Sequence, residues 1–69
     1  MKTATIKAIT KKIPSSLGGF YEVGDTIKTI NLENVERVTC MDSHGDITFY
    51  YRNGLHEIYN GNNIEVIFE

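Results

Sequence analysis

The sequence predicts an all-β fold, a small antiparallel barrel or sandwich of five to six strands. Ile, Thr, Val, Tyr and Phe make up 27 of the 69 residues, and their branched or aromatic side chains suit a pleated sheet. Ala and Leu, which favour helices, supply only five residues between them. In addition, Asn53-Gly54 lies between two alternating apolar runs, which is the strongest short-range signal for a β-hairpin.

Length and cysteine content limit the organisation of the chain. The 69 residues contain one cysteine, so an intrachain disulfide is excluded and a cytoplasmic location is favoured. No apolar run reaches the roughly 18 residues of a membrane span or the apolar core of a signal peptide. We therefore expect one small β domain over residues 1–69, cytoplasmic and without a membrane partner. Since so short a chain builds a small core, we also expect a homo-oligomer.

The N-terminal half holds the less regular strand signals. Residues 2–13 alternate imperfectly, because Ile9 and Ile13 change parity after an apolar face formed by Ala4, Ile6 and Ala8. This pattern favours a strand with a bulge near Ala8-Ile9, and a helical stripe is the alternative. Residues 14–19 are predicted as a loop or a single helical turn, Gly24-Asp25 as a turn, and residues 26–30 as the next strand.

The C-terminal half is predicted to form a four-stranded antiparallel meander, compatible with an SH3-like or an OB-like barrel. A two-residue turn at Asn53-Gly54 places Phe49 opposite Ile58, and a turn over residues 43–46 places Cys40 opposite Phe49. A three-residue loop over residues 61–63 places Val66 opposite Ile58, whereas a two-residue loop would bury a carboxylate there. The predicted core face carries Val38, Cys40, Ile47, Phe49, Tyr51, Ile58, Ile64, Val66 and Phe68.

The opposite face of this meander is the predicted binding surface, because it carries the residue types that are enriched at interfaces. Arg37 is predicted directly opposite Arg52, and like charges across a strand pair are mildly destabilising, although Glu57, diagonal to Arg52, partly offsets them. An ordinary solvated face is the first alternative, and a second core beneath the tyrosines is the other. The candidate binding residues are Arg37, Met41, Tyr50, Arg52, Leu55 and Tyr59.

We expect no catalytic residue, metal site or cofactor. On the predicted register Cys40 and His56 lie two strands apart, about 10 Å, whereas a nucleophile and its base need about 3 Å. Cys40 is therefore interpreted as a small buried side chain. Residues 42–46 hold potential ligands at alternate positions but lack the further oxygen ligands of a calcium loop, and Gly18-Gly19 lacks the lysine of a phosphate loop. An enzyme is the least favoured class.

Two function classes remain, and charge separates them. Residues 1–21 carry four lysines and no acid, residues 22–69 carry three basic and nine acidic groups, and the net charge is −2. The favoured hypothesis is a non-enzymatic protein-interaction module, with Ile, Asn and Lys usage that is typical of low-GC bacteria and their phages or mobile elements. The alternative is a nucleic-acid-binding barrel, with Tyr50 and Tyr59 stacking on bases, which the net charge disfavours. The lysines themselves fit either a basic docking arm or the protection of an edge strand.

Overall fold

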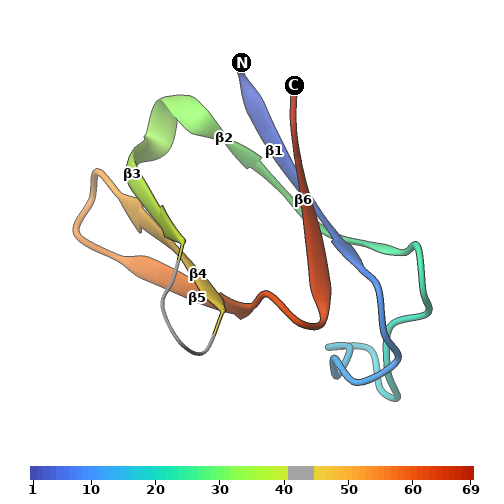
Figure 1. The fold of residues 1–69 in the computed structure, drawn as a ribbon. Helices are drawn as coiled ribbons and strands as arrows, with labels where there is room; N and C mark the ends of the chain where they lie inside the picture. The colour runs from blue at the N-terminus through green and yellow to red at the C-terminus, as the bar shows by residue number, and fades with distance from the viewer. Residues whose placement is uncertain (41–44) are drawn as a thin grey trace.

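A computed structural model describes residues 1–40 and 45–69. Its six strands form two three-stranded antiparallel sheets, with strand orders β2-β1-β6 and β3-β4-β5 (Figure 1). The predicted all-β fold and its strand number are therefore confirmed. Within the described residues, no helix is long and apolar enough to cross a membrane. The elements are β1 (Thr3–Ala8), β2 (Thr26–Asn31), the 3₁₀ helix η1 (Leu32–Asn34), β3 (Val35–Cys40), β4 (Asp46–Tyr51), β5 (His56–Asn60) and β6 (Ile64–Phe68).

The first sheet is built around β1, its central strand. Ala4, Ile6 and Ala8 are fully buried, and the residues between them face outward. The strand interpretation of this segment is therefore right and the helical one wrong, although the strand ends at Ala8 and its register shifts between Ile6 and Lys7, slightly earlier than expected. Because β1 is flanked by β2 and β6, its one lysine, Lys7, does not protect a sheet edge.

The predicted four-stranded meander is wrong in its last strand. β3, β4 and β5 do follow one another in the second sheet, but β6 pairs with β1 in the first, where Val66 lies opposite Ile6 rather than Ile58. This pairing places the apolar side chains of β6 beside the most buried strand of the protein. The chain leaves β5 at Gly61, whose N–H donates to the Gly45 carbonyl at 3.0 Å, and a Cβ at Gly61 would collide with that carbonyl.

The β4–β5 turn is one residue longer than the Asn53-Gly54 motif predicts. The Tyr51 N–H donates to the Leu55 carbonyl at 2.8 Å, and the Gly54 N–H donates to the Tyr51 carbonyl at 3.1 Å. Residues 52–54 thus form a three-residue turn that ends on Gly54 with a φ of 90°. Three-residue hairpin loops commonly end on a left-handed glycine, so the same dipeptide serves either loop length.

The longer turn moves β5 by one residue and exchanges the faces of all its side chains. Phe49 lies opposite Glu57 instead of Ile58, which is 58% exposed. Glu57 and Tyr59, both predicted on the exposed face, are on the core side instead. The Tyr59 ring packs edge-on against Phe49, with ring centroids 6.1 Å apart.

The β3–β4 register differs from the prediction by two residues, which keeps each side chain on its predicted face but changes its partner. Cys40 lies opposite Ile47 rather than Phe49, and Arg37 lies opposite Tyr50 rather than Arg52. The predicted burial of Cys40 is wrong, since Cys40 is exposed at the end of an edge strand.

The core lies between the two sheets. Ala4, Ile6, Ile30 and Ile64 come from the first sheet, and Phe49 comes from the second, together with Val35. Phe49 and Ile6 are the largest fully buried side chains. Two predicted core residues, Val38 and Phe68, are 36% and 43% exposed, because they lie on edge strands where the sheets do not cover each other.

Candidate functional site

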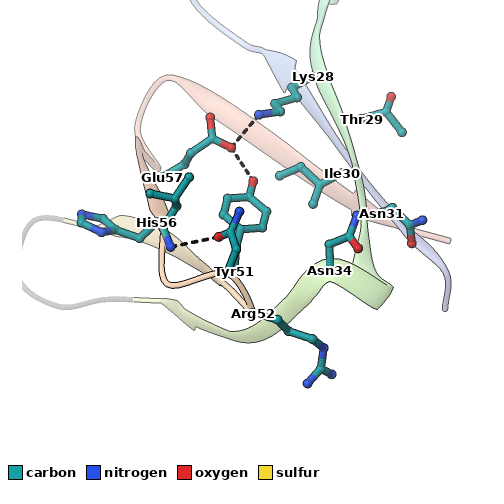
Figure 2. A pocket seen from close by; sticks show the side chains of 11 residues that line it. Lys28, Thr29, Ile30, Asn31, Asn34, Tyr51, Arg52, His56 and Glu57 are labelled. Carbon is teal, nitrogen blue, oxygen red and sulfur yellow. Dashed lines mark hydrogen bonds and ion pairs between the residues drawn. The ribbon is translucent and has the colours of Figure 1, made fainter.

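A cleft of about 790 Å³ lies between β2 and the β4–β5 hairpin (Figure 2). β2 and η1 form one wall of this cleft, and the hairpin forms the other. Residues 28–31, 34, 51–53 and 55–57 line it, and we call it the β2 cleft. It combines an edge strand, apolar side chains and charged groups, so it is the candidate functional site.

β2 presents the edge of its backbone to the cleft. The Leu32 N–H donates to the Lys2 carbonyl at 2.9 Å, and β1 and β2 are antiparallel. Since the polar groups of successive residues point to alternate sides of a strand, those of Ile30 point to β1 and those of Thr29 and Asn31 point away from it. Figure 2 shows Ile30 directed toward the cleft and the side chains of Thr29 and Asn31 on the other side of the strand. Thr29 and Asn31 thus line the cleft with their backbone N–H and C=O groups, along the edge of the strand.

A hydrogen-bonded cluster around Glu57 joins the two sheets at one end of the β2 cleft. Glu57 Oε1 accepts from Lys28 Nζ at 2.7 Å and also from the Tyr51 hydroxyl. Glu57 Oε2 accepts from the Tyr59 hydroxyl at 3.3 Å. Lys28 belongs to the first sheet and the other three residues to the second, so this Glu57 cluster is a polar link across the sandwich.

The electrostatics of the Glu57 cluster favour one protonation state. Burial by itself would raise the pKa of the Glu57 carboxyl, but hydrogen bonds from Lys28 and the two tyrosines outweigh it and lower that pKa below its ordinary value. Burial and the neighbouring carboxylate raise the pKa of Tyr51, and they raise that of Tyr59 to about 12. At neutral pH a carboxylate therefore accepts from an ammonium and two neutral phenols.

The tip of the β4–β5 hairpin docks on η1 at the other end of the cleft. The Arg52 N–H donates to the Asn34 carbonyl at 2.9 Å, and Arg52 Nε donates to the Glu33 carbonyl at 2.9 Å. Leu55 follows the turn and is 66% exposed at the mouth of the cleft. The hairpin thus holds a cation on η1 at this end of the cleft and leaves an exposed apolar side chain, Leu55, in its lining.

The outer face of the second sheet carries a row of three cross-strand neighbours, Arg37, Tyr50 and His56, which we call the outer row. The Arg37 guanidinium carbon lies 4.2 Å from the centroid of the Tyr50 ring, and the Tyr50 and His56 ring centroids are 5.9 Å apart. The guanidinium is close enough to the ring for a cation–π contact. Ile58 lies on the same face of β5 as His56.

The structure describes five of the six predicted binding residues and places them in three different surroundings. Arg37 and Tyr50 meet in the outer row, Arg52 and Leu55 lie at the β2 cleft, and Tyr59 points into the core. Met41 lies outside the described residues, as does most of the 42–46 turn.

Sequence reasoning missed Lys28 and Glu57 as site residues. The alternation of residues along β5 could have indicated Glu57. Leu55, Glu57 and Tyr59 share one face of the strand, and a three-residue turn places that face on the same side of the sheet as Tyr51. The contribution of Lys28 depends on how the two sheets pack, and local pattern does not encode that.

The geometry keeps the thiol and the imidazole apart. Cys40 and His56 lie on the two outer strands of the second sheet, opposite Ile47 and Tyr50 of β4. They are separated by two strand spacings across the sheet and three residues along it, roughly 10 Å in each direction. Among the described residues, no group of three or more His, Cys, Asp and Glu side chains is placed to hold a metal ion.

The fold and the site define a small two-sheet β protein with a strand edge beside a cleft that is partly charged and partly apolar. No protein-family model, no curated protein and no solved structure matches the chain.

Proposed function

We propose that the chain is a non-enzymatic protein-interaction module whose β2 cleft receives an extended segment of a partner protein. The observation that carries the proposal is the position of the β2 edge along a cleft of about 790 Å³, a volume within the usual range of binding sites. Extended peptides bind where a strand edge supplies main-chain hydrogen bonds and neighbouring pockets receive side chains. The β2 cleft offers both.

The side chains of the cleft support this proposal. Leu55 is 66% exposed, which leaves its apolar surface available to a ligand. The Tyr51 ring stands in the centre of the cleft in Figure 2, with its hydroxyl fixed on Glu57. Tyr and Arg are the residue types that most often dominate binding energy at interfaces, and the cleft holds one of each, Tyr51 and Arg52.

The chemistry of the titratable groups supports a binding role over catalysis. Glu57 accepts hydrogen bonds from three donors, which stabilise its ionised form and make it a poor proton acceptor at neutral pH. Cys40 and His56 are too far apart for the hydrogen bond that an activated thiol needs.

The amino-acid composition supports a proposal about the cellular location and origin of the protein. We propose a cytoplasmic accessory or inhibitor protein of a phage or mobile element that works as a homo-oligomer or on a larger partner. The outer row, with Ile58 beside it, is the surface for contact between copies, because it joins an arginine, a tyrosine and an exposed apolar side chain. Sedimentation of the protein and of its Tyr50→Ala variant tests self-association. We expect an oligomer that Tyr50→Ala weakens, and the mass of a monomer for both proteins would contradict the proposal.

A matched pair of variants tests the cleft. Leu55, which immediately precedes β5, and Ile58, in the middle of β5, are both well exposed, but Leu55 lies at the β2 cleft and Ile58 on the outer face. Peptides are selected from a random library on the immobilised protein, and their affinities are measured for the protein and for Leu55→Asp and Ile58→Asp. We expect at least a tenfold loss, about 1.4 kcal/mol, for Leu55→Asp and little change for Ile58→Asp.

Two outcomes would contradict the proposal. The first is that no peptide is enriched over the uncoated support. The second is that the selected peptides bind Leu55→Asp as well as they bind the unsubstituted protein.

The outer row favours a second candidate function, binding of single-stranded nucleic acid. A tyrosine flanked by Arg37 and His56 can stack on a base while the guanidinium contacts a phosphate. The net charge of −2 works against it. Fluorescence anisotropy with a labelled single-stranded oligonucleotide at low salt tests this candidate. Binding that falls steeply with salt and is lost in Tyr50→Ala supports it, and absent or salt-independent binding excludes it.

A further inference from the structure

We infer that the partner segment binds as a fourth strand of the first sheet, paired with β2, and that it places an acidic side chain beside Arg52. This inference rests on the proposed function and names the class of segment that the β2 cleft takes. The segment is extended, alternates apolar and polar residues, and is acidic at one end.

The hydrogen-bonding groups for such a strand are in position. Thr29 and Asn31 direct their backbone N–H and C=O groups away from β1, at the edge that lines the cleft. An added strand exchanges hydrogen bonds with these two residues and leaves those of Lys28 and Ile30 with β1 unchanged. Four consecutive residues of β2 line the cleft, whereas β5, on the opposite wall, contributes only His56 and Glu57. The cleft therefore follows β2.

The two faces of the added strand meet different surroundings. Side chains on its inner face lie on the side of Ile30, where the Tyr51 ring and the exposed Leu55 also line the cleft. Side chains on its outer face lie beside Thr29 and Asn31, both exposed. Because successive side chains of a strand point to opposite faces, the segment that fits alternates apolar and polar residues.

The charges along the cleft determine which end of the bound segment is acidic. The Lys28 ammonium is paired with Glu57, so that end of the cleft is electrically balanced. At the other end, Arg52 is exposed, and its Nε donates a hydrogen bond to the Glu33 carbonyl. This hydrogen bond fixes the position of the guanidinium. By the same formal count that gives the chain a net charge of −2, Lys28, Arg52 and Glu57 give the cleft a net charge of +1. An acidic side chain beside Arg52 complements it.

Amide hydrogen exchange, followed residue by residue by NMR, tests the added strand. The probe is the tightest-binding peptide from the selection described above, and the protein is measured with and without it. We expect exchange of the Thr29 and Asn31 amides to slow at least tenfold on binding, while the Lys28 and Ile30 amides, already bonded to β1, change little. Protection of His56 and Ile58 instead would place the strand on β5 and overturn the inference.

Two substitutions at Thr29 separate the backbone from the side chain. Thr29→Pro removes the outward N–H without removing a bond to β1 and is expected to weaken peptide binding at least tenfold. Thr29→Val keeps the N–H and is expected to bind normally. If Thr29→Pro does not fold, the exchange measurement on the unsubstituted protein still decides.

The acidic preference has its own measurement. The selected peptides should carry Asp or Glu at one end, and Arg52→Gln should weaken their binding about two- to fivefold at low salt, with the difference lost at high salt. Enriched peptides without an acidic residue would overturn this part. Failure of the proposed function is recognised separately, because peptides that bind through Leu55 but leave the Thr29 and Asn31 amides unprotected contradict only the added strand.

Discussion

Replacement of Glu57 by glutamine tests the polar link between the sheets. The substitution keeps the size of the side chain and removes its charge. In the folded protein the carboxylate accepts from Lys28 at 2.7 Å, from the Tyr51 hydroxyl and from the Tyr59 hydroxyl at 3.3 Å. Glutamine keeps one carbonyl acceptor, and its NH₂ group lies where a donor is already present.

The size of the effect follows from these contacts. Hydrogen bonds to a charged group contribute about 1.5–3 kcal/mol each, and neutral ones about 1 kcal/mol. The ion pair contributes less, about 0–1 kcal/mol, because the Lys28 and Glu57 side chains are 46% and 35% exposed. We expect Glu57→Gln to lower the free energy of unfolding by about 2 kcal/mol at neutral pH, which corresponds to about 8–16 °C in Tm for a chain of this size.

The pH dependence identifies the charge as the cause. The folded state lowers the pKa of Glu57, so its contribution is present above the unfolded-state pKa of about 4.3 and is lost as pH falls through the lower, folded-state value. Urea unfolding of the protein and of Glu57→Gln should therefore differ at neutral pH and converge in acid. Glu36→Gln, at an exposed position on β3, is the control and should change stability by less than about 0.5 kcal/mol. Equal stability at neutral pH, or the same difference at every pH, would refute this reasoning.

Three further predictions concern single residues. Cys40 is exposed and should react with a thiol reagent in the native protein as fast as it does in urea, so strong native protection would contradict its position. Gly54→Ala should lower the free energy of unfolding by about 1–2 kcal/mol, measured by urea unfolding, because its φ of 90° disfavours a side chain. Tyr59 should titrate near pH 12 in an ultraviolet absorbance titration. Since the folded state raises its pKa, its contribution to stability is complete below about pH 10 and is lost as pH rises toward 12; an ordinary titration near pH 10 would be the contrary result.

The errors of the sequence prediction trace to loop length and strand pairing. Asn53-Gly54 correctly marked the β4–β5 hairpin, but a glycine at the end of a three-residue turn looks the same in sequence as one in a two-residue turn. That single residue moved Ile58 outward and Glu57 inward. The next error, pairing β6 with β5, came from assuming that consecutive strands pair, whereas β6 lies beside β1.

The candidate site was predicted only in part for the same reason. Arg52 and Leu55 lie in and beside the turn, where sequence signals are local, and both line the β2 cleft. Tyr59 was assigned to the wrong face because β5 moved by one residue. Lys28 reaches Glu57 across 29 positions of sequence, and no local pattern connects them.

The sequence by itself determined the β class, the alternation of β1 and the place of the β4–β5 turn, because composition, periodicity and turn chemistry act over a few residues. The tertiary structure decided which strand lies beside which, which face of β5 is buried, and where the β2 edge opens onto a cleft. These depend on the total apolar area that two sheets bury against each other, a sum over residues far apart in the chain. A one-residue change in a turn exchanges the buried and exposed faces of a whole strand and so changes that sum. The residues of the candidate site could therefore be identified only from the packed sheets.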